Sequence, residues 1–402
     1  MRRRSIPMFI ALLSLSISAL AADWPRFRGP KGDGISPEVG INKNWAQKKP
    51  ETLWTFSMSD DGYAGPSVAG GRVFITDHQG DKDVLRALEI ASGKQVWESI
   101  YPSPGGANYG FSRSTPTIDN GKVYVVCRTG VVYCFDEKDG KPIWSRDLKK
   151  DFNGKQPGWL WSMSALIDGG KVIVCPGGDN ASVAALNKET GETIWAGGGS
   201  DAPGYATPVA AEIGGRKQYL VFTAGNLIGV DAADGKLLWS FRWKTDDNDV
   251  NAATPILVAK DMVFVTSSYG RGGALVRIAG NKAQAVWENK EFQAHFNTPV
   301  LIGGHLYGIT DPGDMVCLDV KTGKSVWRQK GFEKGGVVAV DRTIIALTGS
   351  GGDVMMMEAK PTGYKELGRL HPLGGQSWTA PIVADGKLIV RNKTALACID
   401  LK

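Results

Sequence analysis

Residues 134–144 read CFDEKDGKPIW, and this stretch decides the fold because its pattern recurs along the chain. A small residue, an apolar residue and an acid lead through a turn with Gly140 to Trp144. Further copies of the pattern end at Trp97, Trp195, Trp239, Trp287 and Trp327. Self-similarity at a fixed period predicts a repeat architecture in which each copy is one structural unit.

A second pattern precedes each copy of the first. It starts at a small or hydroxyl residue before proline, as in Thr115-Pro116, and continues through a glycine turn such as Asn120-Gly121 into a β-branched run. Proline is tolerated at the first position of a strand, and Asn-Gly favours a two-residue hairpin. Eight such starts, spaced by roughly 48 residues, predict eight units of four short strands.

We therefore predict an all-β fold, an eight-bladed β-propeller with Trp-docking repeats. The last unit ends at residues 398–400 without a fourth strand, whereas residues 51–56 form a strand pattern around Trp54 near the N-terminus. An N-terminal strand that completes the eighth blade would close the ring and remove exposed sheet edges. The structural repeat tryptophans, which we expect to pack between blades, are Trp54, Trp97, Trp144, Trp195, Trp239, Trp287 and Trp327.

The N-terminus has the pattern of an export signal. Residues 2–4 are three arginines, residues 8–20 are mainly apolar, and residues 19–21 fit a cleavage site. We divide the chain into a signal peptide (1–21), an N-terminal extension (22–50) and the propeller (51–402). No cysteine follows the cleavage site, and no later stretch is long and apolar enough to span a membrane. We therefore expect a periplasmic or secreted protein without a lipid anchor.

Charge and cysteine content narrow the range of partners. The chain has 47 basic and 41 acidic residues, a net charge of +6 that falls to +3 without residues 2–4. Because this charge is small and forms no basic cluster, we expect no nucleic-acid binding, and we expect a monomer. The five cysteines are expected to be buried thiols, with Cys127 and Cys175 of neighbouring units the one pair in reach of a bond.

These residues resemble the pyrroloquinoline-quinone (PQQ) repeat family, whose signature is Ala-x-Asp-x-x-Thr-Gly-x-x-x-Trp. The resemblance covers the mature chain and implies the propeller fold. Residues 23–30, DWPRFRGP, look like the start of secreted PQQ-like propellers of planctomycete-type bacteria. The superfamily includes quinoprotein alcohol dehydrogenases, which bind PQQ and calcium on the propeller axis. It also includes non-enzymatic scaffolds, such as the propeller lipoprotein of the outer-membrane β-barrel assembly machinery.

The sequence departs from both kinds of relative. The large quinoprotein dehydrogenases carry two adjacent cysteines over the cofactor, and no two cysteines are adjacent here. There is also no Cys-x-x-Cys-His sequence for a fused c-type haem domain, and the lipidated cysteine of the assembly lipoprotein is missing. The resemblance therefore implies the fold more strongly than it implies an activity.

In a propeller, the connections between blades (D–A) and the B–C loops share one face around the axial channel, which we call the top face. Function is expected there. Aromatic and arginine side chains around one mouth suit a planar or anionic ligand or a peptide, although aromatics that only plug the channel would give the same pattern. The candidate ligand-binding residues are Tyr63, Arg113, Arg128, Trp161, Tyr205, Asn251, His295, Asn297, Trp378 and Arg391.

Candidates for metal binding or catalysis are few. Asp179 and Asn251 are candidate calcium ligands, since hard cations prefer carboxylate and amide oxygens, and Asp311 is the candidate base of a dehydrogenase. The acidic residues 246–249 lack the glycine and the closing glutamate of a helix-flanked calcium loop and read as a solvated loop. No histidine or cysteine pair has zinc-ligand spacing.

Our leading hypothesis is an exported propeller that acts as a binding or scaffold module through its top-face loops. It would have no catalysis and no cofactor, and its partner would be a protein or a glycan. One alternative is a small alcohol or sugar dehydrogenase that depends on PQQ and calcium. A carbohydrate-binding propeller is the other alternative, because rings of Trp and Tyr also stack on sugars.

Overall fold

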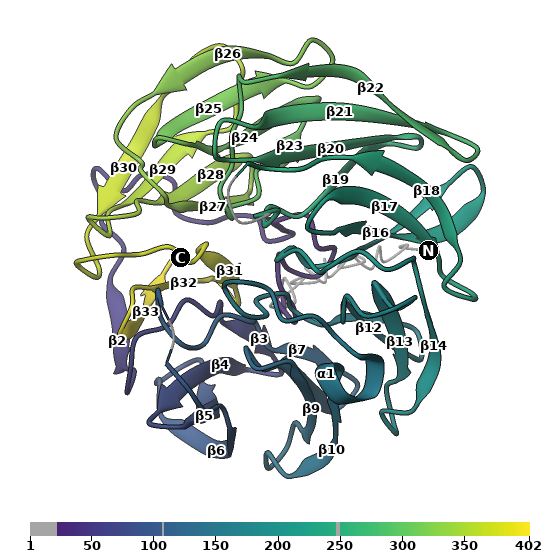
Figure 1. Cartoon of the computed structure of the whole chain (residues 1–402). Coiled ribbons are helices and arrows are strands. Elements are labelled where there is room, and N and C mark those ends of the chain that lie inside the picture. The colour runs from purple at the N-terminus through teal and green to yellow at the C-terminus, as the bar shows by residue number, and fades with distance from the viewer. Residues whose placement is uncertain (1–21, 107, 247–249) are drawn as a thin grey trace, which may run out of the picture.

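The computed structural model describes residues 22–106, 108–246 and 250–402. The expected signal peptide (1–21) and most of the acidic cluster (247–249) lie outside the described residues. In the described part, eight sheets surround a central axis, and the helix α1 (Leu148–Phe152) is the one α-helix (Figure 1). The predicted eight-bladed β-propeller is confirmed.

Blades 1 to 6 each consist of four consecutive antiparallel strands in the spatial order of the sequence. The strands of blades 1 to 3 are β3 (Ser67–Ala69), β4 (Arg72–Gln79), β5 (Lys82–Glu89), β6 (Gln95–Pro102), β7 (Thr117–Asp119), β8 (Lys122–Val126), β9 (Val131–Asp136), β10 (Pro142–Asp147), β11 (Leu166–Asp168), β12 (Lys171–Val174), β13 (Val183–Asn187) and β14 (Thr193–Gly197). Those of blades 4 to 6 are β15 (Val209–Ile213), β16 (Arg216–Phe222), β17 (Asn226–Asp231), β18 (Leu237–Arg242), β19 (Ile256–Ala259), β20 (Met262–Ser267), β21 (Gly272–Ala279), β22 (Lys282–Asn289), β23 (Val300–Ile302), β24 (His305–Thr310), β25 (Asp314–Asp319) and β26 (Lys324–Gln329).

The last two blades each include a strand from the start of the chain. Blade 7 contains β27 (Gly336–Val340), β28 (Thr343–Leu347), β29 (Val354–Glu358) and β30 (Glu366–Leu370), and β1 (Ile35–Ser36) pairs in parallel with β27. Blade 8 contains β31 (Ile382–Ala384), β32 (Lys387–Arg391) and β33 (Ala395–Asp400), and β2 (Thr52–Ser57) pairs with β33 as its outer strand. The predicted closure of the ring by an N-terminal strand is therefore confirmed.

Burial along each blade follows from its contacts with the neighbouring blades. The second and third strands, such as β8 and β13, are covered on both faces and are almost continuous runs of Val, Ile, Leu and Ala. The outer strands, such as β6, have one solvated face and alternate between exposed and partly covered residues. The core is thus a set of layers between blades and leaves the axis open.

The repeat tryptophans connect successive blades. Trp97 of blade 1 donates its indole N–H to the carbonyl of Glu137 in blade 2 at 3.1 Å, and a Cβ atom on Gly140 would lie 2.6 Å from the Trp97 ring. Gly140 also has φ +73°, which side chains disfavour, so the turn requires glycine for two reasons. The equivalent pairs are Trp54–Gly93, Trp144–Gly191, Trp195–Gly235 and Trp287–Gly323.

Trp195 packs on Gly235, but its Nε1 has no hydrogen-bond partner among the described residues. Two further repeat tryptophans, Trp239 and Trp327, do not pack on a turn glycine of the next blade. Trp239 donates to Gln218 Oε1 of its own blade at 2.7 Å, and Ala283 of blade 5 stands where the turn glycine would be. Trp327 donates to the carbonyl of Lys360 at 3.0 Å, at a turn that has lost the repeat pattern. Both tryptophans nevertheless pack in clusters that span two blades, so each repeat tryptophan contributes to a blade interface.

Residues 22–45 cross the inner ends of several blades, and we call this segment the strap. Trp24 pairs with Val68 of blade 1 through two backbone hydrogen bonds of 2.9 and 2.8 Å, and the carbonyl of Pro25 accepts from Ile118 of blade 2 at 2.7 Å. On the other side of the axis, the carbonyl of Gly34 accepts from Ala339 of blade 7 at 2.9 Å. The extension therefore folds back onto the ring before it enters β2.

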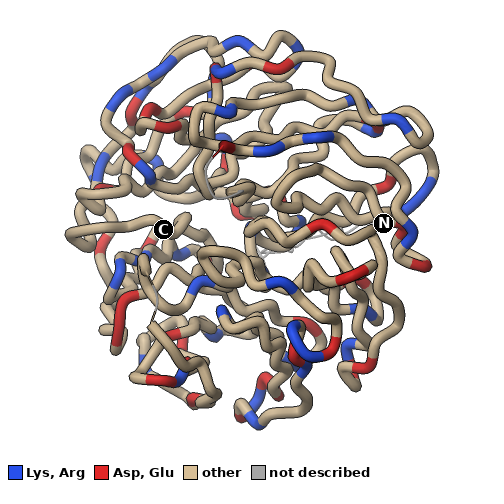
Figure 2. Tube along the Cα trace, in the orientation of Figure 1, with Lys and Arg blue, Asp and Glu red and all other residues tan. Residues whose placement is uncertain are grey.

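The charged residues and the cysteines occupy different parts of the described structure. Figure 2 shows basic and acidic residues interspersed around the ring. All five cysteines are buried and free, and burial raises the pKa of Cys127 to about 11 and that of Cys175 to about 12. None of the described helices has the length and apolar character needed to cross a membrane.

Candidate functional site

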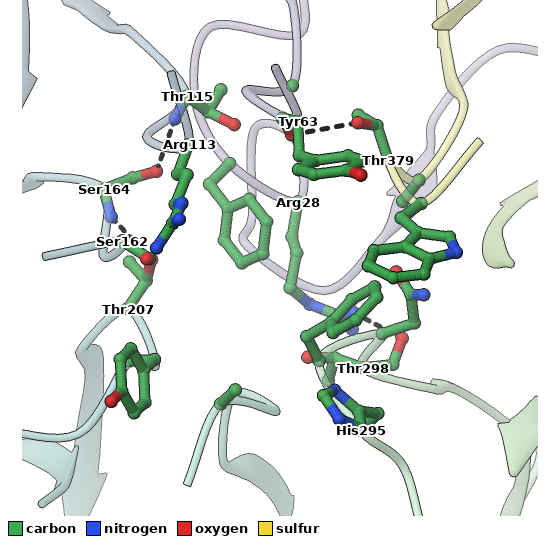
Figure 3. A pocket seen from close by; sticks show the side chains of 18 of the residues that line it. Arg28, Tyr63, Arg113, Thr115, Ser162, Ser164, Thr207, His295, Thr298 and Thr379 are labelled. Carbon is green, nitrogen blue, oxygen red and sulfur yellow. Dashed lines mark hydrogen bonds between the residues drawn. The ribbon is translucent and has the colours of Figure 1, made fainter. Parts of the chain in front are cut away.

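A cavity of about 490 Å³ lies on the axis of the propeller, where the starts of the inner strands meet. Its wall comes from the D–A connections of the top face, and its floor comes from Trp24, Phe27, Arg28 and Gly34 of the strap. Figure 3 shows Arg28 beside Thr298, with Tyr63 and Arg113 on the surrounding wall. The strap thus converts an axial channel into a cavity with a floor.

Arg28 holds the floor in place. Its guanidinium donates to the carbonyls of Thr298 and Pro299 in blade 6, both at 2.9 Å, and to those of Gly32 and Asp33 within the strap at 3.2 and 2.8 Å. Burial lowers the pKa of Arg28 to about 10, while the nearby charge of Asp33 opposes that shift. The side chain keeps its charge at neutral pH, and all its described hydrogen-bond partners are uncharged carbonyls.

A belt of hydroxyl groups surrounds the cavity and explains the hydroxyl-proline pattern in the sequence. The amide of Thr115 donates to Ser164 Oγ of the next blade at 3.0 Å, and the amide of Ser164 donates to Thr207 Oγ1 at 3.0 Å (Figure 3). Thr254 donates in the same way to Thr298 Oγ1 at 2.8 Å. Since the following proline has no N–H, the residue before it supplies the hydrogen bond between blades.

Aromatic rings form a continuous cluster at the mouth, which we call the aromatic rim: Tyr63, Tyr109, Trp159, Phe296 and Trp378. Trp378 is central, with Tyr63 stacked at 5.2 Å, Phe296 at 5.6 Å and Tyr109 at 6.2 Å between ring centroids. Tyr109 is 61% exposed and meets Trp159 edge-on at 5.4 Å. Such a rim is an apolar surface that solvent reaches, which is typical of a recognition site.

Positive charge without a matching acid characterises the wall. Arg113 donates to the carbonyls of Gly110, Asn108 and Trp159, and burial lowers its pKa. Lys334 places its Nζ over the Trp378 ring, 5.7 Å from the centroid, and also lines a small adjoining recess that contains Asp311 and Glu333. The described residues that line the cavity include Arg28, Arg113 and Lys334 but no Asp or Glu.

Six of the residues predicted from the sequence line this one cavity. Tyr63, Arg113, Tyr205, His295, Asn297 and Trp378 come together there, although they belong to connections far apart in the chain. His295 Nε2 and the Tyr269 hydroxyl are 2.7 Å apart, and Asn297 Nδ2 donates to the carbonyl of Lys334 at 2.9 Å. Both side chains therefore also hold neighbouring connections together.

The other four predicted residues are buried away from the cavity. Trp161 is 1% exposed and donates to the carbonyl of Cys175 at 3.3 Å, so it packs in the core of blade 3. Arg128 donates to the carbonyls of Ser103 and Gly105 at 2.7 and 2.6 Å and fixes that connection. Their loop positions were predicted, but the direction of each side chain was not encoded in the repeat.

Asn251 and Arg391 have similar structural roles. Asn251 donates to the carbonyls of Thr223 and Trp243 at 2.9 and 3.0 Å, and its Oδ1 accepts from Ser267 at 2.7 Å. Arg391 is 1% exposed and donates to the carbonyl of Ala64 at 2.7 Å. Burial lowers the pKa of Arg391 to about 10. Both side chains join a blade to the connection beside it.

The described residues do not fit the calcium and quinone group that the fold family implies. The side chain of Asp179 is 74% exposed and accepts from Asn153 at 3.0 Å. Asp311 accepts from the hydroxyl of Ser268 and lines a small recess that shares His295, Asn297 and Lys334 with the cavity, but it does not line the cavity itself. The side-chain amide of Asn251 already forms hydrogen bonds with Thr223, Trp243 and Ser267. No cluster of three His, Cys, Asp or Glu side chains occurs in the part of the chain that the structure describes.

Sequence reasoning missed several lining residues. Tyr109 and Trp159 lie in long D–A connections with several aromatic residues, so their residue type and position in the sequence could have identified them as candidates. Phe296 lies between the predicted residues His295 and Asn297, whereas Lys334 lies in a short connection for which the sequence predicted no site residue. Arg28 gave no such signal, because the strap lies outside the repeat and its course across the axis is set by the closed ring.

Comparison with known proteins identifies the family. The model of the family described as "Outer membrane protein assembly factor BamB", a PQQ-repeat family, matches residues 45–126 and 81–329. BamB of Salmonella typhimurium is 27% identical over 347 residues, which cover 77% of this chain and 80% of that protein. BamB of Shewanella oneidensis is 25% identical over 269 residues, or 61% of this chain and 64% of that protein.

Solved structures show the same fold at low identity. BamB from Moraxella catarrhalis superposes with a TM-score of 0.64 at 16% identity, over 88% of this chain and 98% of that one. A europium-containing methanol dehydrogenase superposes with a TM-score of 0.68 at 14% identity, over 94% and 98%. These two likenesses establish the fold alone. Because the family model covers most of the propeller, the chain belongs to the BamB family of PQQ-repeat β-propellers.

Proposed function

We propose that this protein is an exported, non-catalytic binding module that holds a protein partner on its top face. The aromatic rim carries the proposal, because solvent reaches Tyr109 and its neighbours around a mouth that also presents Arg113. Exposed Tyr and Trp beside Arg are the residue types that dominate binding energy in protein interfaces. The BamB relatives are named as outer membrane assembly factors, and we propose a periplasmic or secreted partner of this kind.

The division into signal peptide, extension and propeller is part of the proposal. A cleaved export signal of residues 1–21 would leave a chain that starts at the strap, where Ala22 already accepts a hydrogen bond from Asp385. We also propose that the segment 23–30 marks the secreted PQQ-like propellers of planctomycete type. In such proteins the segment would serve as the floor described above.

Site-specific photocrosslinking in the exporting cell tests the proposal. A photoreactive residue at position 109 is expected to give one dominant protein adduct, which mass spectrometry identifies. The matched control is position 286, because Val286 is 46% exposed on the outer strand β22, far from the rim in sequence and structure. No adduct at position 109, or the same adducts from both positions, would contradict a partner site at the rim.

A second measurement tests the absence of catalysis. We expect calorimetric titration of the mature protein with PQQ in calcium to show no one-to-one binding, and dye-coupled alcohol oxidation to show no turnover. The physical reason is the lack of carboxylates among the described lining residues, since calcium needs several oxygen ligands. Turnover in that assay would instead favour the dehydrogenase alternative.

A further inference from the structure

We propose that the axial cavity binds one acidic sugar unit, a hexuronate or the uronate end of an acidic polysaccharide. The proposal concerns the inside of the cavity and does not depend on a protein partner at the aromatic rim. It rests on three properties of the described lining: an excess of positive charge, a belt of hydroxyls and a wall of aromatic rings.

The charge favours an anion. Arg28 and Arg113 direct their N–H groups at carbonyl oxygens, so no carboxylate of the described chain neutralises them within hydrogen-bond distance. Lys334 lies above Trp378 at the mouth and forms no salt bridge with another described residue, although the adjoining recess that it also lines contains Asp311 and Glu333. A recess with low-dielectric walls and one sign of charge concentrates the field and attracts ions of the opposite sign.

The polar groups favour a polyhydroxylated ligand over a flat apolar acid. Six Ser and Thr residues are among the described residues that line the cavity: Thr115, Ser162, Ser164, Thr207, Thr298 and Thr379. A hydroxyl has one donor and two acceptor sites, so these groups, several of which already bond to the backbone, keep sites that match the hydroxyls of a sugar and that an aromatic acid would leave unused. Aromatic residues of the same wall, such as Tyr205 and Trp159, offer surface for the C–H face of a pyranose ring.

The shape of the cavity indicates that it binds the terminal unit of a polysaccharide. The cavity of about 490 Å³ falls within the range of about 300–1,000 Å³ that is usual for small-ligand sites. Its floor is closed by the strap, through the Arg28 bonds to blade 6 and the Trp24 bonds to blade 1. A polymer therefore has no exit on the far side, and only a terminal unit fits inside.

Calorimetric titration of the mature protein tests the proposal, with glucuronate and galacturonate as probes. Glucose and galactose are the matched controls that lack the carboxylate, and benzoate is the control for a flat acid without sugar hydroxyls. We expect both uronates to bind at one site with an affinity that falls as sodium chloride rises, because salt screens the attraction. The neutral sugars and benzoate are expected to bind at least about tenfold more weakly, the effect of losing one charge-assisted hydrogen bond or its equivalent.

Two variants show where the uronate binds. Lys334→Gln is expected to weaken uronate binding by about tenfold, while Lys330→Gln, on an exposed lysine outside the cavity, leaves it unchanged. The proposal would be overturned if the two variants had equal effects or if no uronate bound at millimolar concentration. It would also be overturned if glucose bound as well as the uronates or if benzoate bound more tightly than they do. Photocrosslinking at position 109 is read separately, so failure of the sugar site is distinguishable from failure of the protein site.

Discussion

Trp97 and Trp378 show two different ways in which this propeller uses an indole ring. Trp97 packs on the glycine of one short motif in the next blade and donates to a carbonyl of the same turn. Trp378 contacts Tyr63, Phe296 and Lys334, which come from separate connections and repeat nowhere. The first environment is local and recurs in blade after blade, whereas the second exists only once the ring has closed.

This difference separates stability from recognition. Substitutions in the repeated contacts are expected to destabilise the ring, since each contact belongs to a blade interface. Substitutions at the aromatic rim are expected to change binding while leaving the folded ring intact. The predictions below test that separation, in order of decreasing effect on stability.

Among the substitutions at the repeat tryptophan contacts, the strap and the rim, the largest effect is expected for Gly140→Ala. The new methyl group would contact the Trp97 ring at 2.6 Å and would also require φ +73° of an L-residue. We expect a loss of about 2–4 kcal/mol in the free energy of unfolding, measured from urea unfolding curves. Gly121→Ala is the matched control, because Gly121 has φ +77° but no atom within 4 Å of the new methyl group. An equal loss in both variants would show that backbone conformation alone explains the glycine.

The next largest effect is expected for a substitution that tests how Arg28 anchors the strap. Arg28→Met removes the donors to Thr298 and Pro299 and leaves these carbonyls without their partner at the floor. We expect the free energy of unfolding to fall by about 2–3 kcal/mol, which is measured as a lower Tm. We also expect faster proteolysis within residues 22–34. Lys31→Met replaces an exposed residue of the same segment and should change neither Tm nor the rate of proteolysis. A stable Arg28→Met protein with an intact strap would contradict the role of Arg28 as the anchor of the floor.

The fold was predictable because its determinants are local and repeated. The glycine turn, the tryptophan and the hydroxyl-proline pair each specify a contact with the next blade, so eight copies determined the blade number and the unpaired strand at residues 51–56 determined the closure. The site was predictable only by region. Trp161 and Trp378 precede inner strands in the same way, yet one packs in the core and the other in the cavity wall, because side-chain direction depends on connections that differ in length.

The strap was beyond sequence reasoning for a related reason. Its contacts run to blades 1, 2, 6, 7 and 8, which surround one axis only in the closed ring. No period in the sequence relates Arg28 to Thr298, which is 270 residues away. Arg128 and Arg391 were expected at the ligand for their charge, but both lie outside the cavity, where each donates to backbone carbonyls through only part of its guanidinium; Arg128 Nε and Arg391 Nε and Nη2 have no hydrogen-bond partner among the described residues.

A smaller loss of stability is expected when a repeat tryptophan loses its indole N–H, and its size should differ between Trp97, which bonds to a backbone carbonyl, and Trp239, which bonds to a buried side chain. Trp239→Phe leaves Gln218 Oε1 without its donor in a site where both residues are 3% exposed, and we expect a loss of about 2 kcal/mol. Trp97→Phe leaves the Glu137 carbonyl at a partly solvated turn, so about 1 kcal/mol is expected. Urea unfolding of both variants provides the comparison. A larger loss for Trp97→Phe would mean that the repeated hydrogen bond contributes more than the buried side-chain pair.

The smallest effect on stability is expected at the rim itself. Tyr109→Ala removes a side chain that is 61% exposed, and we expect the free energy of unfolding to change by no more than about 0.5 kcal/mol. Tyr101→Ala, eight residues earlier, removes a ring that is 3% exposed between Tyr133 and Phe135 and should cost about 3–5 kcal/mol. Binding of the partner found by crosslinking should show the opposite order at temperatures where both proteins are folded, with Tyr109→Ala the weaker binder. If Tyr109→Ala proved as destabilising as Tyr101→Ala, the rim would be part of the structural core, and the separation between stability and recognition would fail where it matters most.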